Sequence, residues 1–74
     1  MDQMSDDKRR KKTLAHPLRS RIFGCLDGGR ELPTTVICGE VDEQLSVVAY
    51  HLRVLEATGL VRAEGTTRPV WSRR

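Results

Sequence analysis

Few residues of this chain could carry out catalysis or bind a metal ion, and their positions argue against both. A metal site needs three or four Cys, His or carboxylate side chains that converge on one point. The soft metal ligands lie in four separated segments of the chain: His16, Cys25, Cys38 and His51. The sequence also shows no Ser-His-Asp order, no pair of carboxylates placed for acid–base work and no glycine-rich phosphate loop. We therefore predict no catalytic residue, no metal site and no cofactor, and we find no sign of a small-molecule ligand.

The segment from residue 44 to residue 61, QLSVVAYHLRVLEATGLV, fits a different chemistry, the recognition of DNA bases. Its apolar residues recur at steps of three and four, which places four of them on one helical face: Leu45, Val48, Leu52 and Leu55. Gly59 follows as a stop signal, because helices often end on a residue that needs positive φ. The pattern predicts a helix over residues 44–58 with a buried apolar stripe.

The opposite face of this helix would offer small polar and aromatic groups to the outside. Ser46, Tyr50 and Arg53 lie on it, and Val47 and His51 lie on its flank. Hydroxyl groups can bond base edges or phosphates in a major groove, and Val47 can touch a thymine methyl group. A face that is merely solvated is the ordinary alternative for an amphipathic helix.

The charged residues are distributed unevenly along the chain, whose net charge is +3 at pH 7. Residues 1–12 hold five cations and three anions, residues 13–43 hold three and five, and residues 44–74 hold five and two. Basic ends around an acidic middle suit a polyanion bound by the N-terminal segment and the second half. A basic tail with scattered surface arginines would give the same counts. The arm residues expected to contact phosphates are Lys8, Arg9, Arg10, Lys11 and Lys12.

The sequence before residue 44 predicts the elements that would support this helix. Residues 1–12 would be a basic arm, either disordered or a short helix capped by Ser5, and residues 13–74 would form one domain. Pro17 fits the first position of a helix that Asp27-Gly28-Gly29 would stop. Its core side would hold Leu18, Ile22, Cys25 and Leu26 with Phe23 beside them, and its outer side Arg19 and Arg21.

A short helix is expected next, capped by Thr34 or Thr35 and filling about two turns to Val41. Asp42-Glu43 would link it tightly to the helix over residues 44–58. Two helices joined by a turn of a few residues form a helix-turn-helix.

A β-hairpin is expected after Gly59, because the hydrophobic period changes there. Residues 60–64 would form one strand, residues 65–68 the turn and residues 69–73 the return strand, with Trp71 facing the core. A basic hairpin after a helix-turn-helix is a wing, and its tip would bring three more residues to DNA: Thr66, Thr67 and Arg68.

Two of these segments together resemble a known family. LAHPLRSRIF (residues 14–23) and AYHLRVLEATGLV (residues 49–61), followed by an arginine-containing hairpin, are similar to the ArsR-type winged helix-turn-helix repressors of bacteria and archaea. The similarity runs from about residue 13 to the end. It implies a mainly α fold with a small β-hairpin and a sequence-specific regulator that binds double-stranded DNA. The recognition helix, 44–58, would lie in the major groove. The wing, 60–74, would lie on the adjacent minor groove or backbone. The DNA-contacting set is then Gln44, Ser46, Val47, Tyr50, His51, Arg53, Thr66, Thr67 and Arg68.

The chain departs from that family pattern in two ways. Metal-sensing members carry two cysteines one residue apart near the helix-turn-helix, whereas the segment from Thr35 to Gly39 holds only Cys38. Many members dimerise through an additional C-terminal helix, whereas this sequence ends at Arg74. The departures argue against metal sensing. A homodimer would pair through the N-terminal segment and the helix from Pro17 to Asp27.

The main alternative is a winged-helix module that binds proteins, such as an adaptor or an antirepressor, without contacting DNA. Such a module would expose an apolar patch, for which Val47 and Val54 are the only hint in the sequence. No apolar run approaches the roughly 20 residues of a membrane span, and residues 1–12 do not resemble a secretory signal. We therefore expect a cytoplasmic protein with reduced cysteines.

Overall fold

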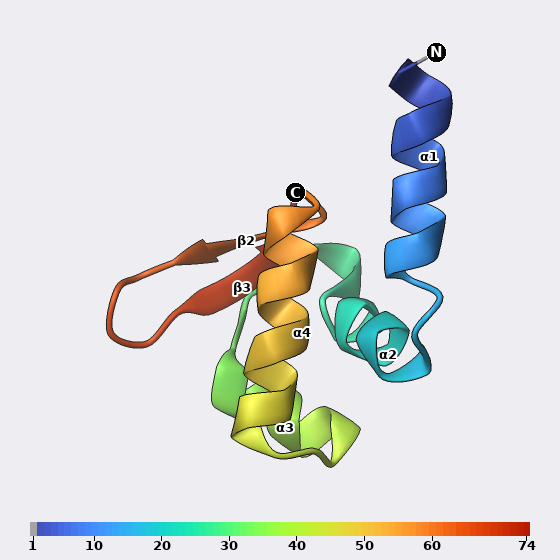
Figure 1. Cartoon of the computed structure of the whole chain (residues 1–74). Helices are drawn as coiled ribbons and strands as arrows, with labels where there is room; N and C mark the ends of the chain where they lie inside the picture. The colour runs from blue at the N-terminus through green and yellow to red at the C-terminus, as the bar shows by residue number, and fades with distance from the viewer. Residues whose placement is uncertain (1) are drawn as a thin grey trace.

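The computed structural model describes the backbone from Asp2 to Arg74 and the side chains from Asp7 onward, so the proposed Ser5 cap lies outside the described side chains. Four helices and a small antiparallel sheet form the domain (Figure 1). The elements, in order, are α1 (Asp2–Thr13), α2 (Pro17–Cys25), the 3₁₀ turn η1 (Asp27–Gly29), β1 (Leu32–Pro33), α3 (Thr34–Val41), α4 (Leu45–Ala57), β2 (Val61–Glu64) and β3 (Val70–Arg73). No described helix is long and apolar enough to cross a lipid bilayer. The predicted winged helix-turn-helix fold is confirmed.

The core lies where α2, α3 and α4 pack together against one face of the sheet. Among residues 7–74, ten buried apolar residues form it: Ile22, Leu26, Ile37, Val41, Val48, Leu52, Leu55, Leu60, Val61 and Trp71. Three members of the predicted stripe on α4 belong to it. Leu45 does not, because 56% of its surface is exposed. The periodicity places Leu45 on the correct side of α4, but it is the first helical residue, and it borders an open groove between α3 and the wing.

Helix α2 begins as predicted, with Pro17 in its first turn and His16 as the N-cap. Ile22 is fully buried, while Leu18, Phe23 and Cys25 are partly buried against the core. Proline has no backbone N–H, and the first turn of a helix does not need that donor. Its fixed φ also suits a helix, so proline marks where the helix starts.

Helices α3 and α4 form the helix-turn-helix. Asp42 adopts a left-handed conformation (φ 54°) and Glu43 N–H donates to the Cys38 carbonyl, which closes the tight link that the sequence predicts. The predicted threonine cap of α3 is wrong, since Pro33 is the N-cap. Thr34 instead accepts a hydrogen bond from the indole of Trp71.

Helix α4 ends as predicted. Thr58 is its C-cap, and Gly59 follows with φ 78°, a conformation that glycine adopts at little cost.

The wing has one strand more than the predicted hairpin. Strand β3 pairs with β2, where Ala63 faces Trp71, and on its other side with β1, where Leu32 faces Trp71. The order β1-β3-β2 puts β3 in the centre of the sheet. Trp71 is only 5% exposed, so the prediction that it faces the core is confirmed. Gly65 (φ 96°) makes the turn, where a Cβ would lie 3.1 Å from the Arg68 carbonyl oxygen.

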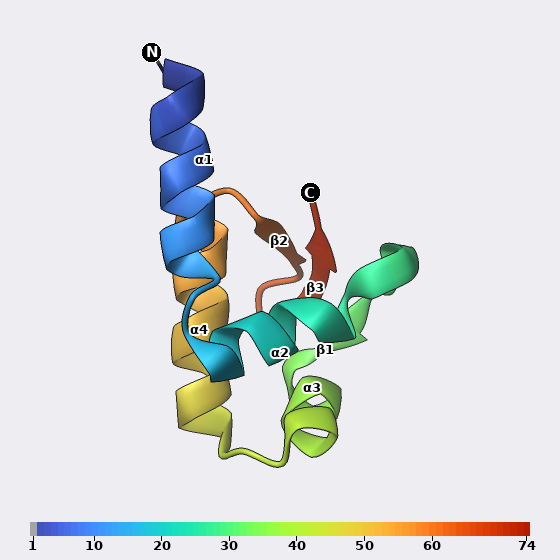
Figure 2. The same ribbon diagram turned by 90° about the vertical axis from the view of Figure 1, so that its right-hand side faces the viewer.

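Helix α1 projects from the rest of the domain. Figures 1 and 2 show it antiparallel to α4 and beside the C-terminal half of that helix, with its N-terminus pointing away from α3. The segment predicted as an arm or a short helix is thus helical through Thr13, and its last turn holds Arg10, Lys11 and Lys12.

Candidate nucleic-acid interface

The outer face of α4 is open to solvent at most of the positions expected to contact DNA. Gln44, Ser46, Tyr50 and Arg53 are exposed, and Val47 is partly buried. The Tyr50 ring is 58% exposed, a large fraction for an aromatic side chain. The Gln44 side chain makes no capping bond, and the Gln44 backbone N–H donates to the Glu43 carboxylate at 3.2 Å. The amide of Gln44 is therefore free to reach a partner.

His51 is placed wrongly by the sequence prediction. Its ring is 6% exposed and points into the interior between α2 and α4. Arg19 Nε donates to His51 Nδ1 at 3.2 Å, and the ring of His16 lies tilted against the His51 ring at a centroid distance of 4.6 Å. Arg19, expected on the outside, also donates to the Thr13 carbonyl and so links three helical segments. The position of His51 on the helical period lies between the buried and the exposed faces of α4. The hydrogen bond from Arg19 on α2 favours the buried side.

Burial is the main cause that lowers the pKa of His51, and the positive charge of Arg19 and the ring of His16 lower it further. The carboxylate of Glu43 acts in the opposite direction. A neutral imidazole with Nδ1 as the acceptor matches the hydrogen bond from Arg19. His51 therefore holds α2 and α4 together, and it does not form part of the outer face of α4.

The wing tip and the first turn of α4 border one groove of about 430 Å³. The residues around it come from α3, α4 and the wing: Pro33, Thr34, Thr35, Leu45, Thr67, Arg68 and Pro69. Thr66, Thr67 and Arg68 are exposed. The structure thus brings the predicted wing residues next to the start of the predicted recognition helix. Leu45, Thr35 and Pro69 were not among the predicted contacts, and nothing in their sequence context separates them from ordinary core or turn residues.

The arginines of the second half fall into two groups. Arg73 donates two hydrogen bonds to the Phe23 carbonyl, at 3.2 and 2.8 Å, and Arg62 pairs with Glu64 at 3.1 Å. Arg53, Arg68 and Arg74 form no ion pair with any residue between Asp7 and Arg74. Arg53 and Arg68 are thus the cations of the α4 face and the wing tip that remain available for phosphates.

The basic run from Lys8 to Lys12 is exposed but lies away from this surface. It belongs to α1, beside the C-terminal half of α4, whereas the groove lies at the opposite end of α4 (Figures 1 and 2). The phosphate contacts predicted for these five residues are therefore separate from those of the wing tip.

The cysteines do not form a metal site or a disulfide. Both are free thiols that are partly buried against the core. Burial, and then the carboxylate of Glu40, raise the pKa of Cys25, so the thiol form is favoured. Between Asp7 and Arg74, no three His, Cys, Asp or Glu side chains come together in a way that could hold a metal ion.

Residues 14–64 match a protein family described as a helix-turn-helix domain. The chain belongs to this helix-turn-helix family. The match covers α2, α3, α4 and β2, which are the elements that form and support the open face of α4. A comparison with curated protein sequences gives no match.

Solved structures share the fold of this helix-turn-helix protein. Mb0332 from Mycobacterium bovis, a homodimeric winged helix-turn-helix DNA-binding domain and possible ArsR-family transcriptional regulator, is 26% identical with a TM-score of 0.81. The similarity covers 97% of this chain and 67% of that one. A transcriptional regulator homologue from Pyrococcus horikoshii OT3 is 26% identical with a TM-score of 0.78, over 100% of this chain and 77% of the other.

HlyU from Vibrio cholerae has a TM-score of 0.88 at 19% identity, over 96% of this chain and 77% of that one. At that identity the likeness shows the fold alone. The resemblance to ArsR-type winged helix-turn-helix regulators that the sequence indicates is confirmed by the family match together with the two relatives at 26% identity.

Proposed function

We propose that this helix-turn-helix protein is a transcriptional repressor that binds specific sites on double-stranded DNA. The observation that carries the proposal is that the wing tip shares one groove with the first turn of α4, a helix whose outer face is open to solvent. Helix α4 would enter the major groove with Gln44, Ser46 and Tyr50 toward the bases, and Arg53 would meet the backbone. Arg68, together with Thr66 and Thr67, would reach the adjacent minor groove or phosphates.

The relatives support the DNA-binding part of this proposal. Mb0332 is described as a DNA-binding domain, and it covers nearly the whole chain at 26% identity. Val47 is partly buried, and the exposed part of its side chain would touch a thymine methyl group. Leu45, at the edge of the groove and 56% exposed, could make a second apolar contact of this kind.

A homodimer on an inverted repeat completes the proposal. Mb0332 is homodimeric. A two-fold dimer places two recognition helices about one turn of DNA apart, roughly 34–36 Å, and so reads two half-sites. The N-terminal segment and α2 would supply the contact between the subunits.

The deciding experiment is selection of binding sites from a random double-stranded library, followed by anisotropy titrations on the selected site and on a scrambled duplex. An inverted repeat bound far more tightly than the scrambled duplex is expected. Each phosphate contact contributes about −0.9 to the slope of log K against log salt, so Arg68→Gln should flatten the slope by about one unit. Selection that recovers no common sequence would contradict the proposal.

The alternative is a module that binds proteins through the same face. Leu45, which borders the groove, is an exposed apolar side chain at 56% and could serve such a contact. If Val47→Ser and Tyr50→Ala keep full affinity for DNA but abolish binding to a protein partner, the module is an adaptor and the DNA proposal fails.

A further inference from the structure

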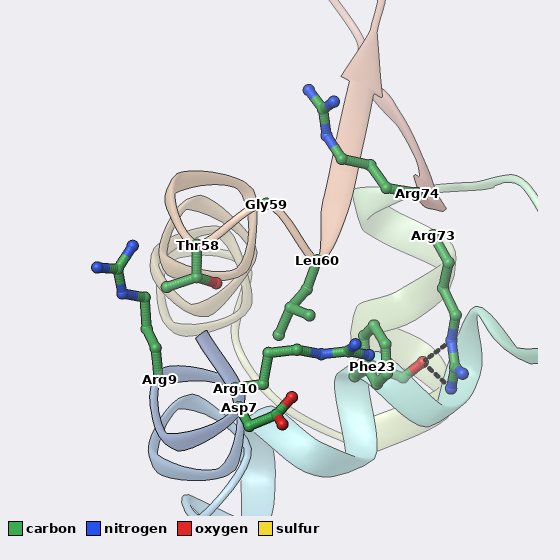
Figure 3. A pocket seen from close by; sticks show the side chains of 9 residues that line it. All are labelled: Asp7, Arg9, Arg10, Phe23, Thr58, Gly59, Leu60, Arg73 and Arg74. Atoms are coloured by element: carbon green, nitrogen blue, oxygen red, sulfur yellow. Dashed lines mark hydrogen bonds between the residues drawn. The ribbon is translucent and has the colours of Figure 1, made fainter. Parts of the chain in front are cut away.

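A pocket of about 540 Å³ lies between α1, the C-terminal end of α4 and the base of the wing (Figure 3). Nine residues border it: Asp7, Arg9, Arg10, Phe23, Thr58, Gly59, Leu60, Arg73 and Arg74. Sites for small organic ligands commonly have volumes of about 300–1,000 Å³. The pocket is thus large enough for a compact organic molecule, and four of its nine bordering residues are arginines.

One of the four arginines belongs to the framework of the pocket. The Arg73 guanidinium donates twice to the Phe23 carbonyl and lies over the Phe23 ring, 3.8 Å from its centroid. Its remaining nitrogen is 3.6 Å from the carboxylate of Asp27. These contacts fix the position of the Phe23 ring and partly neutralise Arg73.

The other three arginines are available to a ligand. Arg9, Arg10 and Arg74 form no hydrogen bond or ion pair through their side chains with any residue from Asp7 to Arg74. Figure 3 shows Arg10 extending from α1 toward Phe23, while the side chains of Arg9 and Arg74 start at the rim and point away from Phe23. Among the residues from Asp7 to Arg74, Asp7 is the one acidic residue of the border. The uncompensated charge of these bordering residues is therefore about that of two cations.

The position of Arg74 depends on backbone contacts. Its backbone N–H donates to the Leu60 carbonyl at 3.2 Å, and Leu60 N–H donates to the Leu55 carbonyl at the end of α4. The base of the wing is thereby closed onto α4. Leu60 and Phe23 contribute apolar surface to the pocket, next to Arg10 and Arg73.

We propose that this pocket binds a small organic phosphate monoester, with the organic part against Phe23 and Leu60. Arg10 would hold the phosphate together with Arg74 and Arg9, whose side chains would turn inward from the rim on binding. A phosphate monoester carries a charge of about −1.5 to −2 at pH 7, which matches the two uncompensated cations. Guanidinium groups bind phosphate oxygens in a bidentate manner. Three guanidinium groups provide more hydrogen-bond donors than the two oxygens of a monocarboxylate would use, so a phosphate fits them better.

The pocket is spatially distinct from the surface proposed to bind DNA. It lies at the C-terminal end of α4, whereas the groove of Leu45 and Arg68 lies at the N-terminal end. A DNA backbone could offer the same phosphate chemistry. The proposal is for a free small molecule, so the experiment must separate the two sources.

Calorimetric titration of the full chain with phenyl phosphate, phenol and inorganic phosphate tests the proposal. Phenyl phosphate should bind most tightly, because only it satisfies both the cations and the apolar surface. The amide resonances of Gly59, Leu60 and Arg74 should shift in NMR spectra on titration. Arg10→Gln and Arg74→Gln should each weaken binding by about tenfold or more, since each removes charge-assisted hydrogen bonds.

Lys12→Gln is the matched control, because it removes one charge from the same helix at an exposed position that does not border the pocket. Equal weakening by Lys12→Gln and Arg10→Gln would show non-specific attraction and overturn the proposal.

Arg68→Gln should weaken DNA binding and leave phenyl phosphate binding unchanged. If Arg10→Gln and Arg74→Gln instead weaken binding of a DNA duplex as strongly as that of phenyl phosphate, the pocket serves the DNA backbone and the small-molecule proposal is wrong. The phenyl phosphate titrations do not depend on the proposed repressor function.

Discussion

Trp71, in the central strand of the wing, donates its indole N–H to the hydroxyl of Thr34, the first residue of α3, at 2.8 Å. The two residues are 37 positions apart in the chain. The bond joins the sheet to the first helix of the helix-turn-helix, and it satisfies an indole that is otherwise buried. The orientation of the wing relative to α3 and α4 therefore depends on a contact that local sequence signals do not contain.

Thr34→Val should destabilise the protein by about 1–3 kcal/mol, because it leaves the buried indole N–H of Trp71 without an acceptor. Thr34→Ser keeps the hydroxyl and should stay close to the wild type. Urea unfolding followed by Trp71 fluorescence measures both. Equal stability of the Val and Ser variants would show that the hydrogen bond contributes nothing.

Leu52→Ala and Leu45→Ala form a matched pair on one helix. Leu52 is fully buried, and its truncation should cost about 2–5 kcal/mol through the cavity that it leaves. Leu45 is 56% exposed, so its truncation should change the free energy of unfolding by no more than about 0.5 kcal/mol. Thermal unfolding of the two variants provides the comparison. A large loss from Leu45→Ala would mean that the groove is closed in solution.

Tyr50→Ala tests the base-reading role of α4. Tyr50 is 58% exposed and lies outside the hydrophobic core, with an edge contact to the ring of His51, so the variant should still fold. Affinity for the selected DNA site should fall by about 1–3 kcal/mol, while binding to a scrambled duplex should hardly change. Anisotropy titrations on both duplexes measure this. Equal losses on the two duplexes would assign Tyr50 to the backbone instead.

Arg68→Ala and Arg73→Ala separate the tip of the wing from its base. Arg68 is exposed and unpaired within the described part of the chain, so its loss should weaken DNA binding with the melting temperature unchanged. Arg73 bonds the Phe23 carbonyl twice, so its loss should lower stability by about 1–3 kcal/mol. Calorimetry and DNA titration of each variant should therefore give opposite results. The reverse pattern would show that the roles are exchanged.

The stability of the protein should depend on pH through His51. Its pKa is about 6.5 when unfolded and is lowered in the fold, first by burial and then by Arg19 and His16. Below pH 6.5 the unfolded state therefore binds more protons, so stability is lost as the pH falls from 6.5 through the folded pKa. Protonation of Nδ1 would also remove the acceptor of the Arg19 hydrogen bond and place two donors next to each other.

His51→Asn, which retains an acceptor but does not titrate, should remove this dependence. Melting temperatures of both proteins between pH 7.5 and pH 5 provide the measurement. An unchanged pH profile in the variant would assign the dependence to other groups.

The sequence by itself determined those features whose signals are local. Pro17 sets the start of α2, Gly59 ends α4, and the change of hydrophobic period after Gly59 predicts β2 and β3. These assignments hold because a fixed φ, a positive φ and a side-chain period act within a few residues. The exposed positions of Gln44, Ser46, Tyr50 and Arg53 followed from the same helical period.

Tertiary structure alone decided where each helical face meets a neighbour. The period places Leu45 with the core and His51 on the flank, but the structure exposes the first and buries the second beside Arg19. In the structure the Thr34 hydroxyl accepts a hydrogen bond from Trp71 and does not cap a helix. Arg10 and Arg74, from opposite ends of the chain, border one pocket. A period defines the direction of a side chain, whereas burial depends on which distant segment packs there. Which segment packs there depends on the free energy of the whole core, and not on the local sequence.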